Sequence, residues 1–380
     1  MRVLHAFNLA NDGFNVVRGL RKIGVDAELL IQKPSHVASL PQWEDGEVDM
    51  FQLGNPYDPN WNAFTWNMPD WVHVWNANKS WYPFSRTLRW LRIFGKLKGY
   101  DLIVGHVPFA KVSTLYQTLY GKPYIVYDAG WIRYLKNNAR GYARARKGYA
   151  QAAMILFTNV DTEQMFHEHG YHNLYYTPFA IDTDKYTPRP NHIDHDYPVF
   201  FHPSRHDWAE KGNDLLIRAF ARYVKRNPRA LLRMVEWYQS PEDLWASKRL
   251  IQDLEIANKC EWISVQPKSR LVNLYRDSTA IFDQFVFGAF GTTCPEGLSC
   301  GVPVVGYAKP NLWLQYHETM PPVLNASTEN DIYEAMLSLE DEATRKRFGQ
   351  EGRQWVMENC SDVVVAKQQL ALYKQVVESN

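Results

Sequence analysis

The sequence of 380 residues contains few cysteines, and their spacing matches neither a metal site nor a disulfide framework. It has no C-x-x-C pair, and no histidine stands near a cysteine at the spacing of a zinc ligand. We therefore expect no bound metal. The four cysteines are expected to be buried thiols in a reducing compartment: Cys260, Cys294, Cys300 and Cys360.

Long apolar runs and a net charge are also missing. No stretch approaches the roughly 18 apolar residues of a membrane-spanning helix, and residues 1–5 resemble a strand rather than a signal peptide. The formal net charge is only +1, so the chain as a whole is not drawn to nucleic acid or anionic lipid. We expect a cytoplasmic protein, either soluble or peripheral at the inner membrane face.

The first half of the sequence has the pattern of an α/β domain. Apolar residues at 3–7, helical spacing over 14–23 and a second apolar run at 27–31 predict a β-α-β opening. The loop between the first strand and helix lacks G-x-G-x-x-G, which argues against a tightly bound dinucleotide in this half. Further strands are predicted at 101–104, 124–127 and 154–157.

Two polar residues, His106 and Asp128, directly follow predicted strands of this half. Ligands of open parallel sheets bind beyond the carboxyl ends of the strands, so both side chains are candidates for a cleft. A turn or helix-cap role is the more common one for a single polar residue at a strand end.

The segment 187–198 is polar, rich in proline and without apolar periodicity, which predicts a linker. We therefore predict domains at 1–186 and 199–360, with a last helix in 361–380. The second half again alternates strands and helices, which predicts a second parallel sheet. The strands are expected at 199–202, 231–236, 261–265 and 280–283, and helices at 214–226, 247–254 and 271–276.

The most informative segment runs from Phe290 to Val305. Gly291, Thr292 and Thr293 begin a predicted helix, where free backbone N–H groups favour an anion. Glu296, about one turn further, has the position to accept hydrogen bonds from vicinal hydroxyls such as those of a ribose. The alternative is an ordinary helix and strand in which Glu296 is merely solvated.

This segment, F-G-x-x-x-x-E-G-L-S-C-G-V-P-V-V, resembles the nucleotide-binding region of glycosyltransferase family 4, a group of retaining GT-B enzymes. Residues 204–212 are similar to the family's diphosphate clamp, with Arg205 and Lys211 as its cations. Residues 178–186 and 347–373 are similar to the interdomain and closing segments. The resemblance implies two Rossmann-like domains with parallel sheets facing across a cleft, and a C-terminal helix crossing back to the first domain.

The activity implied is transfer of a sugar from a UDP-, GDP- or ADP-sugar to a glycan or lipid-linked acceptor, with no cofactor and no metal. A planar guanidinium and a point charge suit the oxygens of a diphosphate leaving group. Fixed cations there would stabilise the transition state more than the ground state. A nucleotide-sugar epimerase or hydrolase on the same fold is an alternative.

The sequence departs from the family at two positions. Gly288 stands where the family usually has a glutamate that reaches the donor sugar, so Asp283 and Gln284 are proposed to contact the sugar instead. The family's histidine is missing from residues 126–131, where Asp128 is closest to it. Asp128 or His106 is then the predicted catalytic residue, orienting the acceptor or the sugar.

Residues 71–150 are strongly basic, with 14 Lys and Arg against two Asp, and the rest of the chain is correspondingly acidic. A predicted helix over 84–98 has a cationic stripe beside an apolar one. We expect an acceptor or membrane face there, formed by Arg86, Arg89, Trp90, Arg92 and Lys96. A packed helix with a solvated face, or a nucleic-acid-directed glycosyltransferase or binder, are the alternatives.

Overall fold

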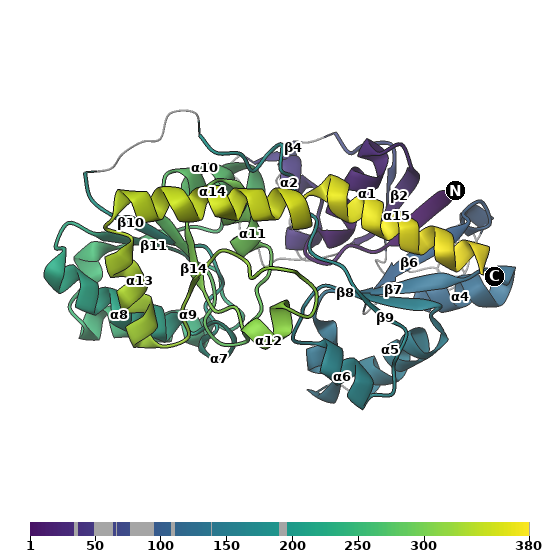
Figure 1. Ribbon diagram of the computed structural model, residues 1–380. Helices are drawn as coiled ribbons and strands as arrows, with labels where there is room; N and C mark the ends of the chain where they lie inside the picture. The colour runs from purple at the N-terminus through teal and green to yellow at the C-terminus, as the bar shows by residue number, and fades with distance from the viewer. Residues whose placement is uncertain are drawn as a thin grey trace. The chain divides into compact units, whose positions relative to one another are not determined.

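The computed structural model describes residues 1–33, 37–48, 64–65, 67–76, 95–107, 111–137, 139–189 and 196–379. The chain divides into two compact α/β units, one of residues 1–180 and 362–380 and the other of residues 181–361 (Figure 1). The predicted Arg86, Arg89, Trp90 and Arg92 lie outside the described residues. No described helix is long and apolar enough to span a membrane.

The first unit contains a seven-stranded parallel sheet in the order β5-β2-β1-β6-β7-β8-β9. The central strands β6, β7 and β8 are buried along their whole length, as expected for a parallel sheet covered on both faces. The strands are β1 Arg2–Ala6, β2 Asp26–Lys33, β5 Val72–Asn76, β6 Leu102–His106, β7 Tyr124–Asp128, β8 Met154–Phe157 and β9 Leu174–Tyr176.

The helices of this unit are α1 Asp12–Lys22, α2 Gln42–Asp45, α4 Lys111–Tyr120, α5 Ala139–Gln151, α6 Glu163–Glu168 and α15 Asp362–Glu378, with 3-10 turns at Val37–Ser39 and Trp131–Asn137. Two short strands, β3 Glu47–Val48 and β4 Phe64–Thr65, pair antiparallel to each other.

Helix α15 packs along α1 of the first unit, as predicted from the family resemblance (Figure 1). A Cβ atom on Gly19 would lie 2.4 Å from the carbonyl oxygen of Asp362, so only glycine permits this approach. Lys22 Nζ is 2.8 Å from the Asp362 carboxylate. Val365 and Tyr373 are fully buried in the same core, and each such side chain stabilises the packing by roughly 1.5–3 kcal/mol.

The second unit contains a six-stranded parallel sheet in the order β12-β11-β10-β13-β14-β15. Its strands are β10 Val199–His202, β11 Leu231–Val235, β12 Cys260–Ile263, β13 Ala280–Phe282, β14 Val304–Gly306 and β15 Leu324–Asn325. Together the two sheets confirm the predicted fold class.

The helices of the second unit are α7 Trp208–Lys211, α8 Asn213–Arg226, α9 Pro241–Asp253, α10 Lys268–Arg276, α11 Thr293–Ser299, α12 Pro310–Trp313, α13 Glu329–Ser338 and α14 Glu342–Asn359, with a 3-10 turn at Ala257–Lys259. Helix α9 begins at Pro241 rather than at the predicted 247. The reason is that proline suits the first helical position and Glu242 and Asp243 complement the helix dipole.

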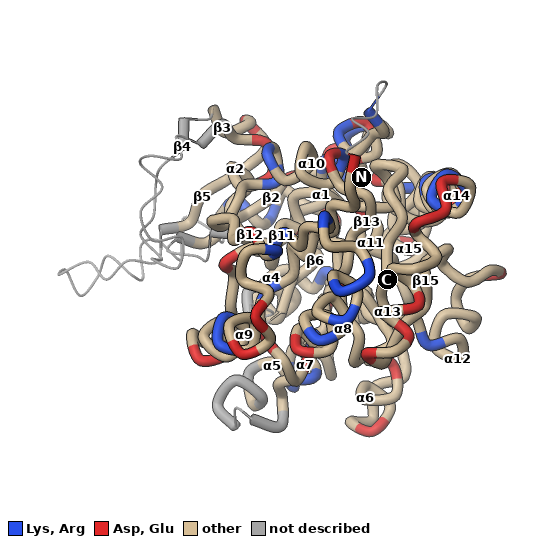
Figure 2. The backbone as a smooth tube through the Cα atoms, turned by 90° about the vertical axis from the view of Figure 1, so that its left-hand side faces the viewer, with Lys and Arg blue, Asp and Glu red and all other residues tan. Residues whose placement is uncertain are grey.

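Helices α8 and α13 pack together and carry opposite charges on their exposed edges. Arg222 Nη1 lies 3.3 Å from Glu329 Oε1, and its guanidinium stacks over the ring of Tyr333. Figure 2 shows the basic residues on α8 and the acidic residues on α13. Exposed pairs of this kind contribute only about 0–1 kcal/mol, so the buried apolar face of α8 provides most of the stability.

Candidate functional site

The polar residues that the sequence singles out in the second unit gather at the carboxyl ends of β10 and β13. Ser204 and Arg205 follow β10, and Asp283 and Gln284 follow β13, which is its neighbour in the sheet. Parallel strands end at the same edge, so topology alone brings these side chains together.

Arg205 lies in the loop between β10 and α7, where it is paired with acidic side chains of its own loop. Its Nη2 contacts the Glu210 carboxylate and lies 3.4 Å from Asp207 Oδ2. Asp207 also caps α7 by accepting a hydrogen bond from the backbone N–H of Glu210 at 3.1 Å. The predicted phosphate-binding arginine is thus held by local carboxylates in this structure.

Lys211 joins the loop after β10 to the loop after β13. Its Nζ donates a hydrogen bond to the side-chain oxygen of Gln284, and its carbonyl accepts from the backbone N–H of Phe285 at 3.1 Å. Gln284 in turn donates to the carbonyl of Ala289. Two predicted site residues therefore meet directly, and the lysine charge is placed at the strand edge.

Asp283 is completely buried beside these residues. Ser204 Oγ donates to its Oδ1 at 2.7 Å, whereas Oδ2 has no hydrogen-bond partner within the described residues. Burial raises the pKa of Asp283, and the charges of Lys211 and Lys268 act against that rise.

Glu296 is 3% exposed, and its carboxylate is fully occupied by two side chains of α10. Lys268 Nζ lies 2.5 Å from Oε1 and 2.7 Å from Oε2, and the Tyr275 hydroxyl donates to Oε2 at 2.8 Å. Burial and the adjacent carboxylate raise the pKa of Tyr275 well above its usual value. Lys268 was missed from the sequence, where its only signal is its position at the start of a helix.

The loop before α11 contains two glycines with opposite surroundings. A Cβ atom on Gly291 would meet nothing within 4 Å, so this backbone borders open space, and Thr292 and Thr293 beside it are partly exposed. Gly288 has φ +73°, and a Cβ atom there would lie 2.5 Å from Lys309 Cβ. The fold therefore excludes any side chain at the position where the family usually has a glutamate.

A buried network beneath the loop after β10 sets its conformation. His202 Nδ1 donates to the Phe282 carbonyl at 2.7 Å, so its Nε2 accepts from Asn213 Nδ2, also at 2.7 Å. Asn213 Oδ1 accepts the backbone N–H of Asp207 at 2.8 Å. Burial lowers the pKa of His202 to about 4, which keeps the ring neutral. Sequence reasoning did not identify this network.

The first predicted catalytic residue, His106, lies in the core of the first unit and is 1% exposed. Its Nε2 is 3.1 Å from His5 Nδ1, and His5 Nε2 is 3.2 Å from the Tyr373 hydroxyl. These contacts connect β6, β1 and α15. Burial lowers the pKa of His106 to about 3.

Asp128 is also fully buried, and its carboxylate orders the turn that follows β7. Oδ1 accepts from the backbone N–H groups of Gly130 at 2.6 Å and Trp131 at 2.7 Å, and Oδ2 accepts from the Tyr149 hydroxyl at 2.5 Å. Burial raises its pKa, which these hydrogen bonds oppose. In the structure Asp128 thus has the geometry of a turn cap, and a catalytic role for it stays a prediction.

Of the predicted basic face, only Lys96 falls in the described part of the chain, and it is exposed. Within the described residues, no three His, Cys, Asp or Glu side chains cluster as metal ligands.

Comparison with known proteins agrees with this architecture. Residues 185–355 match the model of the family described as glycosyl transferases group 1. No curated protein sequence matches the chain. Solved structures that share its fold over nearly their whole length include the following three.

HepE from Anabaena, in complex with UDP and glucose, is 13% identical with a TM-score of 0.72, covering 99% of this chain and 100% of that one. Sucrose-phosphate synthase from Thermosynechococcus elongatus is 15% identical with a TM-score of 0.70, covering 100% of both chains. An alpha-glucosyltransferase in complex with UDP and a 13-mer DNA containing an HMU base is 10% identical with a TM-score of 0.67, covering 98% and 99%.

These similarities establish the GT-B fold for the chain, and the family match covers the unit that holds the candidate site. With a glycosyl transferases group 1 domain in its second unit and this fold throughout, the protein is a glycosyltransferase.

Proposed function

We propose that the protein is a cytoplasmic family 4 enzyme that transfers a sugar from a nucleotide diphosphate sugar to a glycan or lipid-linked acceptor, with retention and without a metal. The observation that carries the proposal is the convergence of Lys211, Gln284 and Asp283 at the carboxyl ends of the second sheet, with the Glu296–Lys268 pair close enough for Lys268 to act on the pKa of Asp283. UDP is the first nucleotide to test, because HepE and the DNA-bound alpha-glucosyltransferase were both solved with UDP.

Lys211 and Arg205 would bind the diphosphate by exchanging their present partners. Arg205 would leave the carboxylates of Asp207 and Glu210, and Lys211 would leave the neutral amide of Gln284. The second exchange is the easier, since an amide oxygen competes less well than a phosphate for an ammonium group. As the glycosidic bond breaks, negative charge grows on the diphosphate, and these cations stabilise it.

Glu296 would hold the ribose hydroxyls, with Lys268 as its counter-ion. A buried carboxylate next to a diphosphate would repel the donor if it stood alone. Lys268 contacts both of its oxygens, so the pair presents no net charge, and the ribose hydroxyls would have to displace one of these contacts or the Tyr275 hydroxyl to reach the carboxylate. The open backbone at Gly291 lies only a few residues before Glu296 in the chain, where a phosphate oxygen would meet N–H donors.

The donor sugar would contact Gln284 and Asp283 in place of a residue at 288. Gly288 cannot carry a side chain, whereas Asp283 has one carboxylate oxygen without a described partner. For Asp128 and His106 the buried geometry supports positioning of the strand ends of the first unit rather than direct contact with the sugar.

A nucleic acid acceptor is the second candidate, favoured by the basic segment 71–150 and by a neighbour solved with DNA. Incubation with a radiolabelled sugar donor and either a membrane extract or duplex DNA separates the two acceptors by where the label appears. Release of free sugar with the donor alone would indicate a hydrolase instead.

The donor site itself is tested by thermal unfolding with UDP, GDP, ADP and their glucose conjugates. Binding to the folded state raises the Tm by mass action. We expect one nucleotide to raise the Tm of the wild-type protein and to have little effect on Lys211→Gln. Equal unfolding curves with and without every nucleotide would contradict the proposal.

A further inference from the structure

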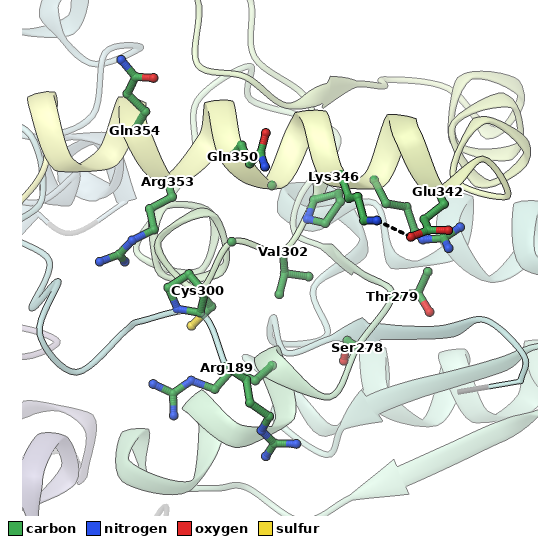
Figure 3. Close-up of a pocket in the computed structure, with 16 residues that line it drawn as sticks. Arg189, Ser278, Thr279, Cys300, Val302, Glu342, Lys346, Gln350, Arg353 and Gln354 are labelled. Carbon is green, nitrogen blue, oxygen red and sulfur yellow. Dashed lines mark ion pairs between the residues drawn. The ribbon is translucent and has the colours of Figure 1, made fainter. Parts of the chain in front are cut away.

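A pocket of about 700 Å³ lies in the second unit, away from the candidate donor site (Figure 3). It is bordered by residues that precede β13 and β14, among them Thr279 and Val302, and by one face of α14. The donor-site residues follow the carboxyl ends of β10 and β13. Because the strands are parallel, the pocket lies at their amino ends and the donor site at their carboxyl ends.

The lining of the pocket is strongly basic. Five basic side chains and one acidic side chain border it: Arg189, Arg276, Arg345, Lys346, Arg353 and Glu342. Arg189 pairs with Asp277, and Lys346 pairs with Glu342 at 2.5 Å. Figure 2 shows both signs of charge along α14. Two of the basic groups are therefore neutralised locally.

The other three arginines donate hydrogen bonds to neutral groups in the described parts of the chain, although Arg345 also lies within electrostatic reach of Asp341 and Glu342. Arg276 Nε donates to the Thr187 carbonyl at 2.6 Å, and Arg353 Nη1 donates to the carbonyls of Tyr186 at 2.9 Å and Ser299 at 2.5 Å. Arg345 Nη1 donates to the Leu339 carbonyl at 2.7 Å. These bonds fix the position of each guanidinium without cancelling its charge.

The centre of the pocket is apolar. Cys300 lies between Arg353 of α14 and Arg189 in Figure 3, and Val302 and Pro303 also line this part of the pocket. The volume is that of a small-molecule site rather than of a single inorganic ion. The shape and charge together suit an anion attached to a body with an apolar face.

We propose that this pocket is a second binding site, specific for a soluble phosphate monoester. Rigid guanidinium forks match the several oxygens of a phosphate and bind it with charge-assisted hydrogen bonds. The apolar floor would hold the body of the ester. The ligand would also contact Arg276, the last residue of α10, and Cys300, which directly follows α11; the first residues of these helices, Lys268 and Thr293, belong to the donor site.

The site is tested by calorimetric titration of the full chain with 4-nitrophenyl phosphate, which combines a phosphate monoester with an apolar ring. We expect one saturable site in the wild-type protein and in the donor-site variant Lys211→Gln. The Arg345→Gln variant loses one charged donor and should bind about tenfold more weakly. 4-Nitrophenol, which lacks the phosphate, should not bind.

Two further variants keep this test independent of folding. Gln350→Glu adds a negative charge to an exposed residue that lines the pocket, so it should weaken binding about tenfold while the Tm stays close to wild type. Arg347→Gln makes the same charge change as Arg345→Gln on the same helix but outside the lining, and it should bind normally.

The proposal is overturned if no saturable binding occurs, or if Lys211→Gln abolishes binding while Arg345→Gln and Gln350→Glu bind like the wild type. The source of the phosphate is tested by flotation with vesicles that contain phosphatidic acid. We expect no flotation that depends on Arg345. Flotation that Arg345→Gln removes would overturn the assignment to a soluble ester.

Discussion

Lys268 Nζ contacts both oxygens of the Glu296 carboxylate, at 2.5 and 2.7 Å, with only 16% and 4% of the two side chains exposed. Because the two charges are close together and largely shielded from water, each stabilises the ionised form of the other. A donor that binds here meets a neutral ion pair rather than a bare carboxylate. The pair therefore links the stability of the second unit to its candidate function.

Removal of one partner of this pair should be costly. Lys268→Met leaves a buried carboxylate without its counter-charge, and we expect the free energy of unfolding to fall by about 3–5 kcal/mol. The double variant Lys268→Met/Glu296→Gln should recover much of that loss in urea unfolding. If the double variant is as unstable as the sum of the single variants, the two side chains are not coupled.

The pairing of Arg205 with Glu210 predicts that the nucleotide competes with a carboxylate. Glu210→Gln should release Arg205 and tighten nucleotide binding by about two- to fivefold, because a partly exposed ion pair contributes only about 1 kcal/mol or less. Arg205→Gln should weaken binding by about tenfold. Fluorescence titration with a labelled nucleotide measures both, and Arg218→Gln, an exposed change on α8, is the control.

Gly288 should tolerate no side chain, including the glutamate of the related family. Gly288→Glu places a side chain on a residue with φ +73° and against Lys309, so we expect the free energy of unfolding to fall by about 2–4 kcal/mol. Gly121→Ala, at φ +64° but with nothing within 4 Å, isolates the backbone effect and should cost about 1 kcal/mol. Equal losses in urea unfolding would show that crowding is unimportant.

Buried neutral histidines should make the protein less stable as the pH falls. Burial lowers the pKa of His106 and His206 to about 3 and that of His202 to about 4, and it lowers that of His5 strongly. Below pH about 6.5 these histidines are protonated in the unfolded chain but stay neutral in the folded protein, so the free energy of unfolding falls as the pH falls. Each histidine should then lower the free energy of unfolding by about 1.4 kcal/mol for each unit that the pH falls, and it should have no effect above pH about 7.

The raised pKa values of Asp128 and Asp283 act in the opposite direction at lower pH, since the folded state then binds protons more readily. Because these four histidines outnumber the two carboxyls, urea unfolding at pH 7.5, 6.5 and 5.5 should show a net loss of stability as the pH falls. A free energy of unfolding that stays constant from pH 7.5 to 5.5 would contradict the assignment of these rings as buried and neutral.

Periodicity predicted the fold well because the strands of both sheets are short buried apolar runs separated by turns. The same logic placed Asp283 and Gln284 correctly, since strand ends in a parallel sheet share an edge. The short strand β15 and helix α13 were not predicted, because the sequence analysis proposed no elements between residues 306 and 346. Helix α9 was predicted to begin too late because apolar spacing, rather than its cap, was used.

The site residues that were missed act through tertiary contacts. Nothing in the local sequence of Lys268 indicates that its side chain will contact Glu296. Likewise, nothing near His202 indicates that its Nε2 will accept a hydrogen bond from Asn213. His106 and Asp128 show the converse, because a strand-end position predicts the edge of the sheet but not the degree of burial. Their networks with His5 and Tyr149 involve residues far away in the chain.

The second unit is proposed to bind the diphosphate of a nucleotide through Lys211 and its ribose through Glu296. Calorimetric titration with UDP, GDP and ADP in turn tests this claim most directly. We predict that one of them binds with one molecule per chain, and that Lys211→Gln and Glu296→Gln each weaken binding at least about tenfold while the exposed Lys225→Gln does not. Binding that is absent for all three nucleotides, or unchanged in both site variants, would contradict the claim.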